Sequence, residues 1–145
     1  MLLLIATAAT GLFAGAAIYV SVVEHPARVS CGTELAIREF GPSYHRGAIM
    51  QASLALAGCG AGLVAGWQRR DWATASAALL LGSLVPFTLI AILPTNRRLL
   101  DPTLSAHDLE ARQLLARWGR LHAVRTVVST VAFAMLLTLF ARAGG

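Results

Sequence analysis

Four long apolar segments constrain the fold of this chain more than any other feature of its sequence. They are residues 1–23, 47–67, 72–93 and 121–141, and only the last contains a histidine or a charged residue, His122 and Arg125, both near its start. A helix needs about 20 residues to cross the hydrocarbon core of a membrane. The segments are continuous and rich in Ala and Leu, without the period-2 alternation of barrel strands. The pattern therefore predicts four transmembrane helices.

The composition also indicates a membrane protein. Hydrophobic residues make up 57% of the chain and charged residues 13%, whereas a soluble domain carries about 25% charged residues. The first segment lacks the positive start of a signal peptide and has a longer apolar stretch, so we expect a retained helix. We predict an all-α fold: an integral membrane four-helix bundle forming a single domain over residues 1–145. Its spans are expected at about 2–24, 46–67, 72–93 and 121–141.

Prolines and a serine predict where the first three helices start, end and bend. Pro26 is expected to end the first helix, because the residue before a proline disfavours the α region. Ser43 follows a Gly-Pro pair that should interrupt any helix, and we expect Ser43 to cap the second helix. Pro86 lies inside the third span and should kink it.

The fourth helix is expected to be long. Ser105 and Asp108 have the spacing of a capping box, which marks a helix start. From there the sequence stays helical in pattern through the last span. We predict an amphipathic extension at about 106–120 that lies outside the hydrocarbon and continues into the span.

Arginine placement predicts the orientation of the bundle. With four spans, the connections between spans 1 and 2 and between spans 3 and 4 share one membrane face. That face carries nine arginines and the other face three: Arg28, Arg38, Arg46, Arg97, Arg98, Arg112, Arg117, Arg120 and Arg125 against Arg69, Arg70 and Arg142. The positive-inside bias then places these two connections in the cytoplasm and both termini outside. The arginines form no stripe with interleaved aromatic residues, so we expect membrane lipid and no nucleic acid as a partner.

Glycines at helical spacing predict close packing between helices. Gly11 and Gly15 form one GxxxG pair, and Gly58, Gly62 and Gly66 form a longer ridge. Small residues let helix backbones approach each other in lipid. The sequence leaves open whether these faces meet helices of the same chain or a second copy in a homo-oligomer.

Polar residues stand at the same end of all four spans, and such a gathering near lipid is a functional-site hypothesis. Trp118, His122 and Arg125 share one face of the fourth helix, and Tyr44 and Gln51 share one face of the second. The candidate catalytic residues are Glu24, Arg46, His122 and Arg125, and the candidate substrate-binding residues are Tyr44, Gln51, Thr88, Asn96 and Trp118. We expect Arg46 or Arg125 to neutralise Glu24, which opposes the dipole at its helix end.

Two kinds of chemistry fit these residues. Glu24, His25, His45 and His122 are candidate metal ligands, since two histidines and a carboxylate can hold a non-haem iron; their scatter over three helices makes this signal weak. The same residue types can instead act as general base and oxyanion stabilisers for an aromatic acid or phenol. The cofactor stays open between none, non-haem iron and copper. No charged residue lies at mid-span, which disfavours an ion-driven pump.

Four stretches of the chain carry a family resemblance. They are GLFAGAAIYVSVVEHPAR at 11–28, YHRGAIMQ at 44–51, PFTLIAILPTNRRL at 86–99 and WGRLHAVRT at 118–126. With them, the chain resembles the anthrone oxygenase-like family of small four-helix membrane proteins, most of which have no assigned function. The PTN run and the W-x3-H-x2-R run are the most specific parts of the resemblance.

The resemblance implies a function. Characterised fungal relatives oxidise anthrones to anthraquinones with molecular oxygen, so this chain is expected to be a membrane-embedded monooxygenase for a lipophilic anthrone- or phenol-like compound. The site residues implied are Glu24, His25, Tyr44, Arg46, Gln51, Asn96, Trp118, His122 and Arg125. Two alternatives remain: a non-catalytic protein that binds haem, a metal or a small ligand, and an accessory subunit that docks a partner through its glycine faces.

Overall fold

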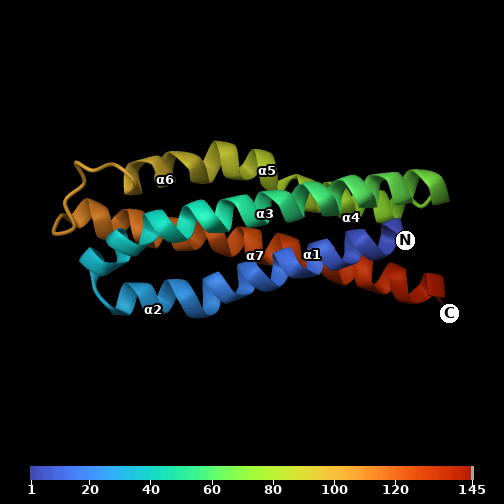
Figure 1. Ribbon diagram of the computed structural model, residues 1–145, viewed down its shortest axis with the longest axis horizontal. Coiled ribbons are helices and arrows are strands. Elements are labelled where there is room, and N and C mark those ends of the chain that lie inside the picture. Colours follow the sequence, from blue (N-terminus) through green and yellow to red (C-terminus); the bar gives the residue numbers. More distant parts are fainter. Residues whose placement is uncertain (145) are drawn as a thin grey trace.

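The computed structural model describes residues 1–144, which form helices and short connections without any strand. The helices join into four rods that run along one long axis (Figure 1). The first rod consists of α1 (Leu2–Tyr19), the π-helical η1 (Val20–Glu24) and α2 (His25–Ser30). The second rod is α3 (Thr33–Arg69) and the fourth is α7 (Leu109–Gly144). The third consists of α4 (Trp72–Gly82), α5 (Leu84–Phe87), the π-helical η2 (Thr88–Ile92) and α6 (Leu93–Leu99).

All four rods are long and apolar enough to cross a membrane. The candidate spans are Leu2–Ser30, Thr33–Arg69, Trp72–Leu99 and Leu109–Ala143. The predicted all-α four-helix architecture is therefore confirmed. The fourth rod is a single helix of 36 residues, as the sequence pattern indicated.

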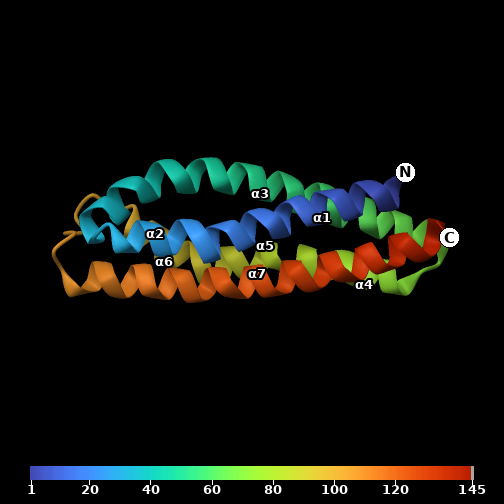
Figure 2. The same ribbon diagram turned by 90° about the horizontal axis from the view of Figure 1, so that it is seen from below.

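The connections of the bundle gather at its two ends. The turn between α2 and α3 and the loop between α6 and α7 lie at one end, which we call the loop end (Figures 1 and 2). Both termini and the turn between α3 and α4 lie at the other, which we call the terminal end. In that turn Asp71 accepts hydrogen bonds from the backbone N–H groups of Ala73 and Thr74 and so caps α4.

The prediction that Pro26 ends the first helix is wrong. The rod continues through Pro26 into α2, and a π-helical turn, η1, directly precedes it. The third rod repeats the arrangement, with η2 directly before α6 and its Pro94. A proline lacks an N–H donor and its ring crowds the carbonyl four residues earlier. The wider π turns accommodate both prolines without ending the helices.

The other two proline predictions had different outcomes. The break expected before Ser43 is absent, since α3 runs without interruption through Pro42 and Ser43 caps no helix. The third rod is interrupted where Pro86 requires it: α4 ends at Gly82, the residue whose carbonyl the Pro86 ring would crowd, and α5 begins at Leu84.

Small residues pack the terminal end within one chain. A Cβ on Gly62 would lie 2.6 Å from the Cβ of Ala78 on α4, and one on Gly58 would lie 2.8 Å from Leu81. A Cβ on Gly11 of α1 would lie 2.7 Å from the Phe133 ring on α7. The glycine ridge of α3 therefore meets helices of the same chain.

Candidate functional site

A cavity of about 720 Å³ occupies the loop-end half of the bundle, where α3 bows away from the other rods (Figure 2). This volume lies within the range of about 300–1,000 Å³ typical of small-molecule sites. All four rods contribute to its wall, which is mostly apolar. The polar and ionisable side chains on the wall are Tyr19, Glu24, Arg28, Glu39, Ser43, Tyr44, Arg46, Gln51, Thr88, Asn96, Trp118, His122 and Arg125. All nine candidate catalytic and substrate-binding residues thus line one cavity.

His122 is the buried imidazole of the wall, with 3% of its surface exposed. Its Nδ1 lies 3.0 Å from Ser21 Oγ on η1. Ser21 Oγ lies 2.7 Å from Thr126 Oγ1, which donates to the carbonyl oxygen of Ala17 (3.0 Å). Since Nδ1 is engaged in this chain of contacts, Nε2 is the ring nitrogen left for a molecule in the cavity.

Trp118 holds the third and fourth rods together at the site. Its indole Nε1 donates to Asn96 Oδ1 (2.9 Å), and Asn96 is 1% exposed. Asn96 therefore lies inside α6 as a buried partner of Trp118 and is not the helix cap that an asparagine near a helix end usually forms. The Trp118 ring also packs against three other rings: it stacks on His122 (4.8 Å between centroids), tilts against His25 (5.0 Å) and meets Phe40 edge-on (5.5 Å).

Arg125 brings a positive charge to the cavity without an acidic partner. Its Nη2 donates to Gln51 Oε1, and its guanidinium carbon lies 5.3 Å from the centre of the Phe13 ring. None of the ion pairs in residues 1–144 includes Arg125, and its Nε is buried without a hydrogen-bond acceptor. An anionic oxygen of a ligand in the cavity would give this guanidinium the negatively charged partner that it lacks.

Glu24 is neutralised by Arg28, and the prediction that Arg46 or Arg125 would do so is wrong. Arg28 is buried and pairs with both Glu24 and Glu39. Ser43 completes the cluster: its hydroxyl donates to Glu24 Oε1 (2.8 Å) and accepts from Arg28 Nη2 (3.0 Å). Glu24 therefore lies at the cavity as part of a paired cluster that joins α2 to α3.

Three further candidate residues differ in their contacts and exposure. Tyr44 stacks parallel to Phe40 at 5.8 Å. The hydroxyl of Thr88 donates to Leu84 O within its own rod (2.7 Å), so towards the cavity its oxygen can only accept. Arg46 lines the cavity as well but is exposed.

The candidate metal ligands are not brought together. Within residues 1–144, no three His, Cys, Asp or Glu side chains lie close enough to hold one ion. His45 is exposed on α3, and His25 packs against Gly119, where a Cβ would lie 2.7 Å from its Nε2. Glu24 is occupied by Arg28. The set Glu24, His25, His45 and His122 therefore does not form the iron site that was considered from the sequence.

Comparisons with known proteins show the family to which this chain belongs. A family model described as anthrone oxygenase matches residues 40–135. The chain is 33% identical over 132 residues to anthrone oxygenase tpcL of Aspergillus fumigatus, and the match covers 81% of this chain and 80% of that protein. The chain belongs to the anthrone oxygenase family. No solved structure matches it.

The part matched by the anthrone oxygenase model contains most of the cavity wall. It spans α3 from residue 40 onward, the third rod and α7 as far as residue 135, and so includes Gln51, Asn96, Trp118, His122 and Arg125. The first rod, with Ser21 and Glu24, lies before the matched range.

Sequence reasoning missed several polar residues of this site, among them Ser21, Arg28 and Ser43. A signal for the first two was present: Ser21, Glu24 and Arg28 follow one another at i, i+3 and i+7, which places them on one helix face. Ser43 carried no such signal, because it was expected to cap a helix.

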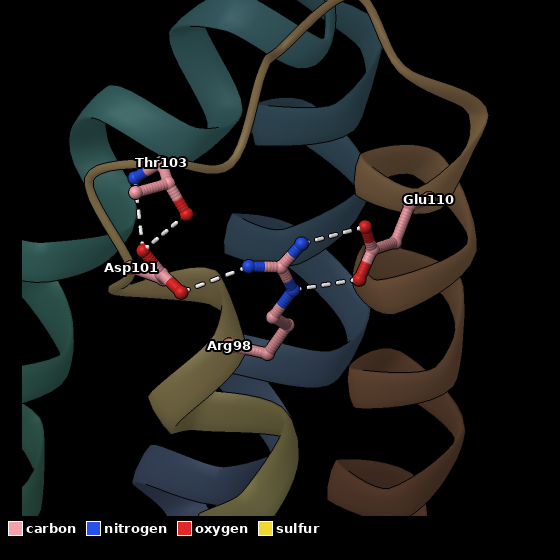
Figure 3. A network of polar contacts seen from close by, with 4 residues as sticks. All are labelled: Arg98, Asp101, Thr103 and Glu110. Atoms are coloured by element: carbon pink, nitrogen blue, oxygen red, sulfur yellow. Dashed lines mark hydrogen bonds and ion pairs between the residues drawn. The ribbon is translucent and has the colours of Figure 1, made fainter.

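A polar network outside the cavity closes the loop end (Figure 3). Arg98 on α6 donates to both carboxylate oxygens of Glu110 on α7 (2.7 and 2.8 Å) and to Asp101 (2.8 Å). The hydroxyl of Thr103 donates to Asp101, and this bond is the largest cause that holds the pKa of Asp101 below its ordinary value. The network ties the third and fourth rods together across their loop.

Proposed function

We propose that this protein is a membrane-embedded oxygenase that oxidises a lipophilic anthrone- or phenol-like compound with molecular oxygen. Its membership of the anthrone oxygenase family supports the reaction class. One structural observation carries the proposal for the site: Arg125, a cation without an acidic partner, lines the same largely apolar cavity as the free Nε2 edge of His122.

The cavity wall suggests how such a substrate binds. Phe13, Ala55 and Leu84 offer an apolar surface at the deep end of the cavity, which suits a flat ring system. Arg125 and Gln51 lie on the polar part of the wall. A phenol or carbonyl oxygen directed at Arg125 would replace solvent with a charge-assisted hydrogen bond.

The substrate is proposed to reach the cavity from the bilayer. Several wall residues on α3 and on the third rod are also exposed on the outside of the bundle, among them Met50 (48%), Val85 (37%) and Leu89 (58%). These side chains are apolar, so this part of the wall faces hydrocarbon when the bundle is in a membrane. A lipophilic compound can then enter the site without crossing water.

The proposed reaction begins with proton transfer. His122 Nε2 removes a proton from the activated methylene of the substrate, and Arg125 stabilises the resulting enolate oxygen. The carbanion adds molecular oxygen to give a peroxide anion at the same carbon. This anion takes back the proton held by His122 to become a hydroperoxide, which then loses water to leave a carbonyl. The methylene thus loses two hydrogens and gains one oxygen atom, while the second oxygen atom leaves as water. Electrons and atoms balance without an external reductant.

The loop end is proposed to face the cytoplasm. Arg28, Arg46 and Arg125 line the cavity, but removing them from the nine arginines of this end leaves six against three, so the positive-inside bias persists. Cys31 is exposed at this end. A membrane-impermeant maleimide should therefore label Cys31 only after the cells or spheroplasts are permeabilised. Labelling of Cys31 in intact cells would show that the loop end faces the outside.

Oxygen uptake by the purified protein tests the proposed function. The protein in detergent or nanodiscs is given an anthrone, a simple phenol or no substrate, each with and without added iron or copper. We expect substrate-dependent oxygen uptake and formation of the corresponding anthraquinone. Absence of both under every condition, with a folded protein, would contradict the proposal and favour a ligand-binding role for the cavity.

A further inference from the structure

A chain of three polar side chains leads from His122 to the backbone of the first rod. His122 Nδ1 contacts Ser21 Oγ (3.0 Å), and Ser21 Oγ contacts Thr126 Oγ1 (2.7 Å). Thr126 Oγ1 in turn lies 3.0 Å from Ala17 O and 3.3 Å from His122 O. Each hydroxyl has one hydrogen to donate, so the direction of these bonds can be worked out from the end that is fixed.

The fixed end is the carbonyl group, which can only accept. If Thr126 donates its hydrogen to Ala17 O or His122 O, it must accept the hydrogen of Ser21. Ser21 has then used its own hydrogen and can only accept from His122, so the imidazole carries its hydrogen on Nδ1. In this arrangement every contact in the chain contains one hydrogen.

The opposite direction leaves a contact without a hydrogen. If Ser21 donated its hydrogen to His122 Nδ1, Thr126 would have to donate its own hydrogen to Ser21. No hydrogen would then lie between Thr126 Oγ1 and the carbonyl oxygens of Ala17 and His122. Two acceptor oxygens about 3 Å apart without a hydrogen are unfavourable in a buried place. Histidine tautomers are assigned from the hydrogen bonds of the two ring nitrogens in this way.

We infer that Ser21 is a positioning residue that holds His122 in the tautomer with its hydrogen on Nδ1, so that Nε2 presents a lone pair to the cavity. The inference deepens the proposed function and rests on it for its catalytic meaning, because the tautomer with hydrogen on Nε2 has no lone pair there to take a proton from a substrate. Ser21 does not line the cavity and therefore acts through His122.

The backbone of the first rod supports this role. Ser21 lies in η1, the π-helical turn that precedes Pro26. π turns occur as local bulges in helices and are frequent at functional sites. In this rod the turn accommodates Pro26, and it also carries the hydroxyl that contacts both His122 and Thr126 on α7.

Nitrogen NMR of the whole protein in micelles tests the inference independently of any activity. The chain has four histidines, and with ¹⁵N-labelled histidine the His122 signals are those lost in His122→Asn. Protonated and unprotonated imidazole nitrogens have well-separated shifts. At a pH where His122 is neutral, we expect Nδ1 to be protonated and Nε2 unprotonated. The reverse assignment would overturn the inference.

Two variants test the role of the hydroxyls. Ser21→Ala should release the tautomer and give a mixture, whereas Ser21→Thr retains a hydroxyl and should restore the wild-type signals. Thr126→Val keeps the side-chain shape but frees the Ser21 hydrogen for Nδ1, so it should move the imidazole hydrogen to Nε2. Wild-type nitrogen signals in folded Ser21→Ala or in folded Thr126→Val would overturn the inference.

Kinetics then test the catalytic meaning. In Ser21→Ala we expect kcat for anthrone oxidation to fall about 10- to 100-fold, by analogy with the loss caused by removing the hydrogen-bond partner that orients a metal-bound histidine, with KM nearly unchanged. A wild-type kcat together with a mixed tautomer would overturn the catalytic role of Ser21. If the wild-type protein does not oxidise an anthrone, the proposed function fails, and the NMR result still decides whether Ser21 sets the tautomer.

Discussion

The same four rods pack in two different ways along their length. At the terminal end, Gly58 and Gly62 of α3 bring its backbone against α4, and a single added carbon would clash. At the loop end, aromatic rings such as Phe40 and Trp118 and the paired cluster around Arg28 stand between the rods, and a cavity of about 720 Å³ remains. One half of the bundle is closed by small residues, and the other is held open by large ones.

This difference shows how a small membrane protein can combine stability with a site. Helices in lipid associate through close packing and not through the hydrophobic effect, so the tightly packed half is expected to provide most of the association energy. In the open half the polar groups lie on the cavity wall, where Glu24 and Arg28 pair with each other. Arg125 has no acidic partner there and is available to bind a ligand. Mutations in the two halves should therefore have different consequences.

The largest effect is expected at His122 in the open half. His122→Asn removes the proposed base but keeps a side chain that can hydrogen-bond to Ser21, so turnover should fall about 10²- to 10⁴-fold with the fold retained. The measurement is anthrone-dependent oxygen uptake, together with the melting curve of the detergent-solubilised protein. His107→Asn is the matched control, because His107 is exposed in the loop before α7; equal rates in the two variants would remove His122 from the mechanism.

Arg125 should give the next largest effect. Arg125→Ala removes the cation proposed to stabilise the enolate, and the loss of one such group typically lowers kcat about 10²- to 10³-fold. Arg125→Lys keeps the charge without the planar donor pattern and should retain part of the rate. Arg120→Ala, which changes an exposed arginine of the same helix, should leave turnover at the wild-type level. An unaffected rate in Arg125→Ala would show that the substrate oxygen binds elsewhere.

Two glycines of α3 compare the halves directly. Gly62→Ala would place a Cβ 2.6 Å from Ala78 and should cost about 1–3 kcal/mol through overpacking. At Gly47, which lines the cavity, an added Cβ meets nothing within 4 Å, so Gly47→Ala should be neutral or stabilise the helix by about 0.5–1 kcal/mol. Melting temperatures in one detergent measure both. Equal destabilisation by the two changes would contradict the division into a packed and an open half.

Much of this architecture could be predicted from the sequence, because uncharged length and charge placement act locally. The four spans, the long fourth helix and the shared end of the polar clusters all follow from such patterns. The face formed by Trp118, His122 and Arg125 also followed from helical spacing alone, and the structure places all three residues on one cavity wall.

The rest could not be predicted because it depends on contacts between rods. Pro26 and Pro42 were expected to end or break helices, but a π turn accommodates the first and the helix runs through the second. Glu24 was matched with arginines on other helices, whereas its partner Arg28 lies one turn away on the same rod. The scattered histidines could be judged as metal ligands only once their distances were known.

The smallest effect is expected at the turn of the terminal end. The hydroxyl of Thr74, followed by its N–H and that of Ala73, holds the pKa of Asp71 below its ordinary value of 3.8. Asp71→Ala should cost about 0.5–2 kcal/mol through loss of the cap, and Asp71→Asn, which retains a capping oxygen, should cost less. Because the folded pKa is lowered, this stabilisation is present above about pH 3.8 and is lost as the pH falls through the folded pKa. Between pH 7 and pH 3, the difference in melting temperature between the wild type and Asp71→Ala should become smaller. A difference that stays constant would contradict a charge-dependent contribution of the cap.

The most direct test of the account is a crystal structure of the protein with a bound anthraquinone, the stable product of the proposed reaction. We predict that the ring system lies in the loop-end cavity, with one carbonyl oxygen at Arg125 and the edge of the rings near His122 Nε2. An anthraquinone bound only on the outer surface, with the cavity filled by lipid or side chains, would contradict the claim that this cavity is where the substrate reacts.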